Sequence, residues 1–304
     1  MLLFWILFNA FALGMLVLDL LVFHRKGHVV SPREALGWSA LWIILAACFA
    51  AIVYFWMGYQ TALEFVTGYI LELSLSVDNL FVFLLIFRYF AVPEQHQHRV
   101  LFWGILGALT LRGIFIGAGV GLIHRFHWLL YAFGAFLIYS GIKFIRGTHQ
   151  VDPQKNPFVK ALRRWLPVTE TYEGGKFLVR GWRGNPGVYA TPLLAVLILI
   201  ETTDVLFAVD SIPAILAITL NAFIVYTSNV FAILGLRSMY FAVSELIKIF
   251  RFLHYGLALV LILVGAKMML ADYFRVPTGI TLAAIAGVLL ISVIASIMFP
   301  EPKQ

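Results

Sequence analysis

Apolar stretches long enough to cross a bilayer recur along almost the whole of this 304-residue chain. Hydrophobic residues make up 62% of the sequence and charged residues only 12%, unlike a soluble globular domain. A hydrocarbon core about 30 Å thick needs roughly 18–25 apolar residues in one helix. The sequence therefore predicts an all-α polytopic membrane protein, with residues 1–304 in a single transmembrane domain. The nine predicted spans are about 2–23, 36–56, 63–88, 99–122, 128–146, 190–218, 221–242, 253–271 and 279–299.

The basic residues favour one orientation of these spans. Arg25 and Lys26 follow the first apolar stretch, and none precedes it, so we expect a retained first helix with its N-terminus outside. In that topology, 17 of the 22 Lys and Arg residues fall in inner loops and two in outer loops. This bias predicts an outer N-terminus and a cytoplasmic C-terminus. Because the charge of +7 is concentrated in those loops, it indicates topology and the lipid bilayer as partner, not nucleic acid.

Carboxylates interrupt two of the predicted spans. A charge near the bilayer centre costs about 2.5–3.5 kcal/mol on insertion scales, so these acids need a physical reason. In both stretches one acid follows another after six residues, and helical spacing puts hydroxyl and amide groups on nearby faces. Such oxygen ligands suit Mn²⁺, Mg²⁺ or Ca²⁺, and the absence of Cys and His there disfavours zinc. The predicted cation ligands are Glu72, Asp78, Asn79, Glu201, Asp204, Asp210 and Ser211.

Basic residues within or near the spans are the expected counter-charges. Arg112, Arg237 and Lys267 lie inside predicted spans, and Lys143 lies near the inner boundary. Two interpretations stay open: the basic groups neutralise the acids in a packed core, or they replace a metal ion whenever the site empties. Two further residues are candidates for the site. Asn229 is an in-span amide, and Pro213 is expected to release a backbone carbonyl that could line a cavity.

The same order of motifs occurs twice along the chain. Residues 63–146 carry an acid pair, then Arg112, then Gly-Ile-Lys143; residues 190–271 carry an acid pair, then Arg237, then Gly-Ala-Lys267. Each unit has three spans, so the two units must face opposite ways across the membrane. Inverted repeats with polar, interrupted helices at their interface are typical of secondary transporters. A chance recurrence is the alternative.

Residues 147–189 form the one predicted soluble segment, a cytoplasmic loop. The segment Asn156–Pro167 sets apolar residues (Phe158, Leu162, Trp165) against basic ones (Lys160, Arg163, Arg164). This pattern predicts a short amphipathic helix on anionic headgroups; a solvated linker is the alternative. The glycine-rich end of the loop is expected to be a flexible connection.

The acidic motifs make the sequence similar to the TerC family of integral membrane proteins, most closely its Alx-type bacterial members. The similar segments are Glu72-Leu-Ser-Leu-Ser-Val-Asp78-Asn79, Glu201-Thr-Thr-Asp204-Val-Leu-Phe-Ala-Val-Asp210-Ser-Ile-Pro213-Ala, and the stretch from Thr227 through Asn229 to Arg237. The resemblance implies a bacterial inner membrane protein linked to Mn²⁺ export and, in other members, to tellurium resistance or metal loading of exported proteins. It places the family's acidic residues at Glu72, Asp78, Asp204 and Asp210, and it alone supplies the choice of manganese.

Two functional classes follow. The first is a secondary transporter that exports a divalent cation, Mn²⁺ on the resemblance, with possible proton coupling. The second is a membrane partner protein, which acts on other membrane or exported metalloproteins and transports nothing itself. An enzyme is not predicted, because the chain has no Walker A, HExxH or GxSxG motif.

Overall fold

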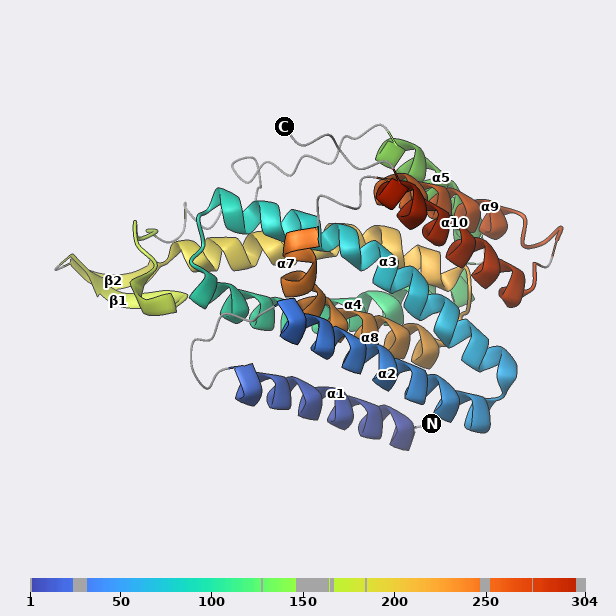
Figure 1. Ribbon diagram of the computed structural model, residues 1–304, viewed down its shortest axis with the longest axis horizontal. Helices are drawn as coiled ribbons and strands as arrows, with labels where there is room; N and C mark the ends of the chain where they lie inside the picture. Colours follow the sequence, from blue (N-terminus) through green and yellow to red (C-terminus); the bar gives the residue numbers. More distant parts are fainter. Residues whose placement is uncertain are drawn as a thin grey trace.

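A computed structural model describes residues 2–23, 32–126, 128–145, 164, 167–183, 185–246, 252–274 and 276–298. These residues form nine α-helices, one for each predicted span, in a bundle whose long helices run roughly side by side (Figure 1). The helices are α1 (Leu2–Phe23), α2 (Pro32–Met57), α3 (Tyr59–Tyr89), α4 (Glu94–Arg125), α5 (Leu129–Ile145), α7 (Pro192–Leu216), α8 (Ala222–Leu246), α9 (Leu253–Met269) and α10 (Thr278–Met298). A helix lies at each predicted position, with boundaries that differ by several residues.

Length and composition alone qualify four described segments as membrane-crossing helices: Glu34–Met57, Glu94–Ile123, Pro192–Leu216 and Thr278–Met298. Four more apolar helices are shorter over their described residues: Leu3–Val17, Leu129–Ile145, Ala222–Leu236 and Leu253–Met269. Many large apolar side chains face outward, among them Leu206 and Ile291. This is the pattern of a protein solvated by lipid, and it agrees with an all-helical membrane protein.

Four helices form the centre of the bundle. Helix α3 packs against α8 and α4 against α7, while α3 also contacts α7 and α4 contacts α8. Helices α1 and α2 cover α8, where aromatic rings such as Phe8, Phe49 and Phe231 interlock. Helix α10 covers α9 and α3 (Figure 1). This arrangement removes the polar face of the central helices from lipid.

Helices α5 and α9 approach each other through glycine. A Cβ atom built on Gly134 would lie 2.9 Å from the carbonyl oxygen of Gly265, and one built on Gly265 would lie 2.6 Å from the carbonyl oxygen of Gly134. Gly141 makes a similar contact with the carbonyl oxygen of Ala258, at 2.7 Å. Small residues at such crossings let helix backbones pack closely in membranes, where burial from water does not drive association.

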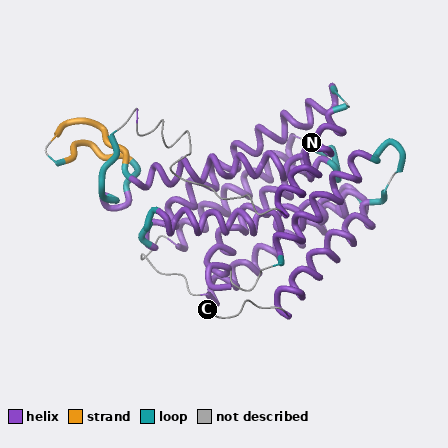
Figure 2. Tube along the Cα trace, turned by 90° about the horizontal axis from the view of Figure 1, so that it is seen from above, coloured by secondary structure: helices purple, strands orange, loops and turns teal. Residues whose placement is uncertain are grey.

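The predicted cytoplasmic loop contains a small sheet, so the all-α prediction is wrong locally. Strands β1 (Leu178–Trp182) and β2 (Asn185–Ala190) pair antiparallel and follow a short 3₁₀ turn, η1 (Glu173–Gly175). Their glycines bend the ribbon: Gly181 has a φ of 71°, next to a register shift between Arg180 and Trp182. The glycine-rich end is therefore an ordered hairpin, which projects beyond the helix ends (Figures 1 and 2).

The loop before the hairpin is fixed to the bundle. The hydroxyl group of Tyr172 donates a hydrogen bond to the carbonyl oxygen of Phe90, at the turn between α3 and α4. Burial raises the pKa of this phenol. The predicted amphipathic segment Asn156–Pro167 lies outside the described residues, apart from Arg164 and Pro167.

The glycine contact between α5 and α9 predicts the effect of one methyl group. Gly265→Ala should lower the unfolding free energy by about 1–3 kcal/mol, because the added carbon meets a backbone oxygen that cannot move aside. Gly287→Ala on α10 is the control, since a Cβ there meets nothing within 4 Å. Thermal unfolding in detergent compares the two. Equal melting temperatures for both variants would contradict a close α5–α9 contact.

Candidate functional site

A buried arginine holds side chains from all four central helices. Arg112 of α4 is 1% exposed. Its Nη2 and Nε atoms donate to Asp204 of α7, at 3.0 Å to Oδ1 and 3.2 Å to Oδ2. Its Nη1 atom pairs with Oε1 of Glu72 on α3 and lies 3.3 Å from Oδ1 of Asn229 on α8. We call these four residues the arginine centre. Its paired contacts with Asp204 have the geometry in which Arg binds a carboxylate most strongly.

The arginine centre has unused hydrogen-bonding capacity. Two carboxylates face one guanidinium, so the formal charge of the four side chains is negative. Within the described structure, three buried atoms there have no hydrogen-bond partner: Oε2 of Glu72, Oγ of Ser76 one turn further along α3, and Nδ2 of Asn229. Buried polar atoms are usually paired, so each of these needs an explanation. Two of the three are oxygen atoms, which could accept a hydrogen bond or bind a cation.

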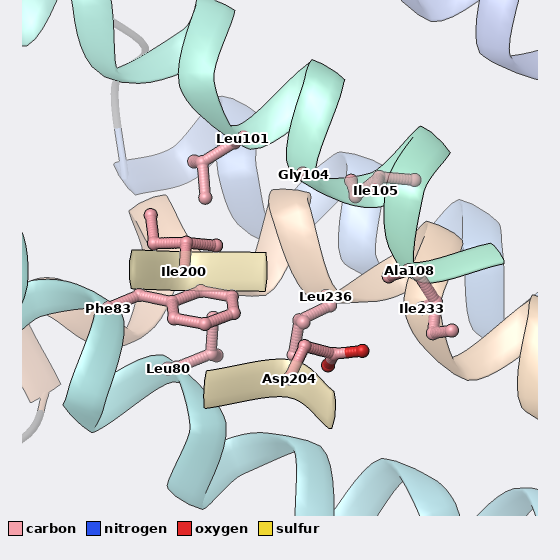
Figure 3. A pocket seen from close by; sticks show the side chains of 10 residues that line it. All are labelled: Leu80, Phe83, Leu101, Gly104, Ile105, Ala108, Ile200, Asp204, Ile233 and Leu236. Atoms are coloured by element: carbon pink, nitrogen blue, oxygen red, sulfur yellow. The ribbon is translucent and has the colours of Figure 1, made fainter. Parts of the chain in front are cut away.

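Asp204 also borders a small apolar pocket. Figure 3 shows its carboxylate at the edge of side chains from α3, α4, α7 and α8, including Leu80, Ile105 and Leu236. The pocket has a volume of about 20 Å³, the space of roughly one water molecule. The centre is thus enclosed on this side by hydrocarbon.

Glu201 lies close to the arginine centre but faces a glycine. Its carboxyl group occupies the space in front of Gly107 on α4, where any Cβ atom would collide with it. Its Oε2 atom is buried and has no hydrogen-bond partner among the described residues. Gly107 therefore forms a slot for this carboxyl group.

Asp210 belongs to a second polar group, away from Arg112. Its Oδ1 atom accepts a hydrogen bond of 2.8 Å from Ser140 of α5. A cavity of about 20 Å³ is lined by Asp210, Ser211 and Asn79, with four apolar side chains completing the wall. The Oγ atom of Ser211 is buried and, within the part of the chain that is described, has no partner. We call Asn79, Ser140, Asp210 and Ser211 the aspartate centre. It can hold one water-sized ligand in an oxygen-rich setting.

The structure thus divides the predicted site residues between two centres. Pro213 lies buried inside α7, one turn beyond Asp210. Lys143 is exposed at the end of α5, and Lys267 is half-buried in α9, near the charge of Glu64. The side chains of Asp78 and Arg237 lie outside the described residues. Among the described side chains, no three His, Cys, Asp or Glu residues converge on a common metal position.

The sequence does not predict a role for Ser140 in the aspartate centre or for Gly107 beside Glu201. Ser140 directly precedes the Gly-Ile-Lys143 motif, and that adjacency was the only available signal. Gly107 is one of many glycines in the spans, and its role depends on which helix lies opposite.

Comparison with known proteins identifies the family. The family described as "Integral membrane protein TerC family" matches residues 57–304. The chain belongs to the TerC family. A Myxococcus xanthus relative, "Uncharacterized membrane protein STKORF319", is 50% identical to this TerC-family chain over 295 residues, 97% of this chain and 92% of the relative. No solved structure matches.

Two further relatives carry a functional name. A Salmonella typhi protein named "Putative membrane-bound redox modulator Alx" is 47% identical over 291 residues, 92% of this TerC-family chain and 89% of the relative. A protein of the same name from Escherichia coli (strain K12) is 44% identical over 303 residues, 95% and 93% of the two chains. These names state membrane attachment and a redox role; they state no enzymatic activity and no transported substrate.

The arginine centre predicts a large cost for removing its cation. Arg112→Met should lower the unfolding free energy by about 3–5 kcal/mol, because two buried carboxylates lose their counter-charge. The control is Arg183→Met, which removes a solvent-exposed ion pair with Glu170 and should change stability little. Thermal unfolding in detergent measures both. Similar melting temperatures for the two variants would mean that the buried ion pairs contribute little.

Proposed function

We propose that this chain is a secondary transporter that exports a divalent cation, with Mn²⁺ as its cargo, through the two polar centres between its central helices. The observation that carries the proposal is the guanidinium of Arg112, buried between Glu72 and Asp204. A positive group between two carboxylates inside a membrane protein stands where a cation would be stabilised by the same charges. The choice of manganese rests on the family resemblance.

The mechanism follows from competition for these carboxylates. An arriving cation displaces the guanidinium from Glu72 and Asp204, and Oγ of Ser76 and Oδ1 of Asn229 complete its oxygen ligands. When the cation leaves, Arg112 pairs with the acids again and the centre closes without an unpaired buried charge. The aspartate centre, with Asn79, Asp210 and Ser211, provides a second position along the path. The proposed set of site residues also includes Asp78, Glu201, Arg237, Lys143 and Lys267.

The packing of the helices supports the proposed inverted repeats. If α3, α4 and α5 correspond to α7, α8 and α9, then the contact of α3 with α8 corresponds to that of α7 with α4. The contact between α5 and α9 corresponds to itself: when Gly141 is aligned with Gly265, Gly134 aligns with Ala258, and the Gly134–Gly265 approach corresponds to the Gly141–Ala258 approach. The arginine centre takes residues from both units, so rocking one unit against the other would open it to alternate sides. We place the protein in the bacterial inner membrane with its N-terminus outside and its C-terminus in the cytoplasm.

The projecting hairpin is the observation that favours the second candidate, a membrane partner protein. It exposes Leu178, Val188 and Arg180 beyond the helix ends, where another membrane or exported metalloprotein could bind. In that case the acids would be needed only for packing.

Metal flux separates the two candidates. In proteoliposomes or everted vesicles, we expect Mn²⁺ flux from the wild type and its loss in Asp204→Asn and Asp210→Asn, because each removes a charge from one polar centre. Glu170→Gln, in the exposed loop before the hairpin, is the control and should keep the flux. If well-folded protein moves no divalent ion, the partner function is favoured. Deleting Asn156–Pro167 should then abolish the partner function of the protein in cells.

The slot for Glu201 predicts a separate effect on transport. Gly107→Ala should lower Mn²⁺ flux by about 10-fold or more, because the methyl group displaces the Glu201 carboxyl group next to the arginine centre. Gly113→Ala on the same helix is the matched control, since its nearest neighbour is a ring carbon of Tyr226 at 3.5 Å, an ordinary contact. Equal flux from the two variants, both folded, would mean that the position of Glu201 is unimportant for transport.

A further inference from the structure

A large apolar cavity lies outside the polar centres, between α1, α2 and α8. Its volume is about 540 Å³, far larger than the spaces beside Asp204 and Asp210. We call it the α1–α2 groove. Its walls are Phe4, Leu7, Phe8, Phe11, Leu45, Cys48, Phe49, Ile52, Val53, Trp56, Met57, Phe223 and Phe231.

The lining of the groove selects hydrocarbon. It contains no charged side chain, and the Cys48 thiol and the Trp56 indole are its only polar side-chain groups. A water molecule needs two to four polar partners to stay in a cavity, and an empty apolar cavity forfeits the packing of all its walls. The groove therefore requires an apolar occupant with no hydrogen-bonding demand.

The depth of the groove matches one leaflet of a bilayer. Along α2 it runs from Leu45 to Met57, the last residue of the helix, which corresponds to about 18 Å at roughly 1.5 Å per residue. Half of a hydrocarbon core of about 30 Å is about 15 Å. At the helix ends, the rings of Phe4 and Trp56 lie 4.4 Å apart, and Trp56 is 65% exposed. Tryptophan at this level is typical of the membrane–water interface.

We propose that the α1–α2 groove binds one acyl chain of a membrane lipid, with the headgroup at the interface beside Trp56. A transmembrane helix of a second copy, about 10–12 Å across with its side chains, is the alternative occupant of this cavity. A single hydrocarbon chain is thinner and adapts to irregular walls.

The bound chain would contact the helix that carries part of the arginine centre. Phe223 and Phe231 line the groove from α8, and Phe231 lies two residues after Asn229. Helix α1 packs on the bundle mainly through α8, so the acyl chain fills the space that α1 and α2 leave over that helix. The lipid thus acts as a structural ligand that supports α8, whether or not the protein transports a metal.

Native mass spectrometry of the purified full chain after exhaustive detergent exchange tests this. We expect one retained lipid per wild-type chain and its loss in Cys48→Trp, which fills the groove. Ile44→Trp is the matched control. Ile44 lies one turn from Cys48 on α2, is exposed and does not line the groove, so the lipid should remain bound. If Cys48→Trp does not fold, Leu45→Trp replaces it in the test, because Leu45 lines the same wall of the groove. Absence of lipid from folded wild type, or equal retention in all variants, would overturn the proposal.

A second measurement addresses dimer formation, using the fact that Cys48 is the only cysteine in the chain. Oxidative cross-linking in native membranes should leave the wild type monomeric if an acyl chain covers the thiol. Efficient formation of a disulfide-linked dimer would show that a second copy covers the groove instead, and the lipid proposal would be wrong.

Discussion

The pairing of Arg112 with Glu72 and Asp204 is the interaction on which the rest of the bundle depends. Each of these groups would be costly in a membrane by itself, and the three together need a fixed geometry to compensate for lost hydration. Because they come from α4, α3 and α7, they set the relative positions of these helices along their axes. Asn229 adds α8 to the same centre. The apolar surroundings could tolerate small sliding movements of the helices, whereas the ion pairs could not.

Helix α7 separates the two polar centres. Asp204 and Asp210 are six residues apart, which on an α-helix of about 3.6 residues per turn is a rotation of some 240°. Asp204 therefore reaches Arg112 of α4, whereas Asp210 reaches Ser140 of α5. One centre is filled by a protein cation and the other has space for a small ligand. This division gives the proposed transporter two distinct positions for a cation instead of one large site.

The parts of the fold around these centres hold together by different means. Helices α5 and α9 rely on glycine contacts between their backbones, and α1 and α2 rely on interlocking aromatic rings over α8. Neither device involves charge. The aromatic packing leaves the α1–α2 groove, which backbone contact between small residues would have closed. Because α5 and α9 belong to different proposed units, their glycine contact joins the two units, and a rocking movement would have to turn about it.

The sequence by itself determined the membrane class, the positions of nine helices and the residues that interrupt them, because runs of apolar residues and their length against a bilayer are local properties. It also identified the family, whose motifs are contiguous. It could not determine which residues meet, because helical periodicity gives a face but not the neighbour that faces it. Hence a single predicted site divides into two centres, Ser140 and Gly107 have no predicted role, and the strands Leu178–Trp182 and Asn185–Ala190 lie where the sequence predicts a flexible connection. Only the tertiary structure decided that Arg112, and no other basic residue among those described, joins Glu72 to Asp204, since that choice depends on how four helices pack.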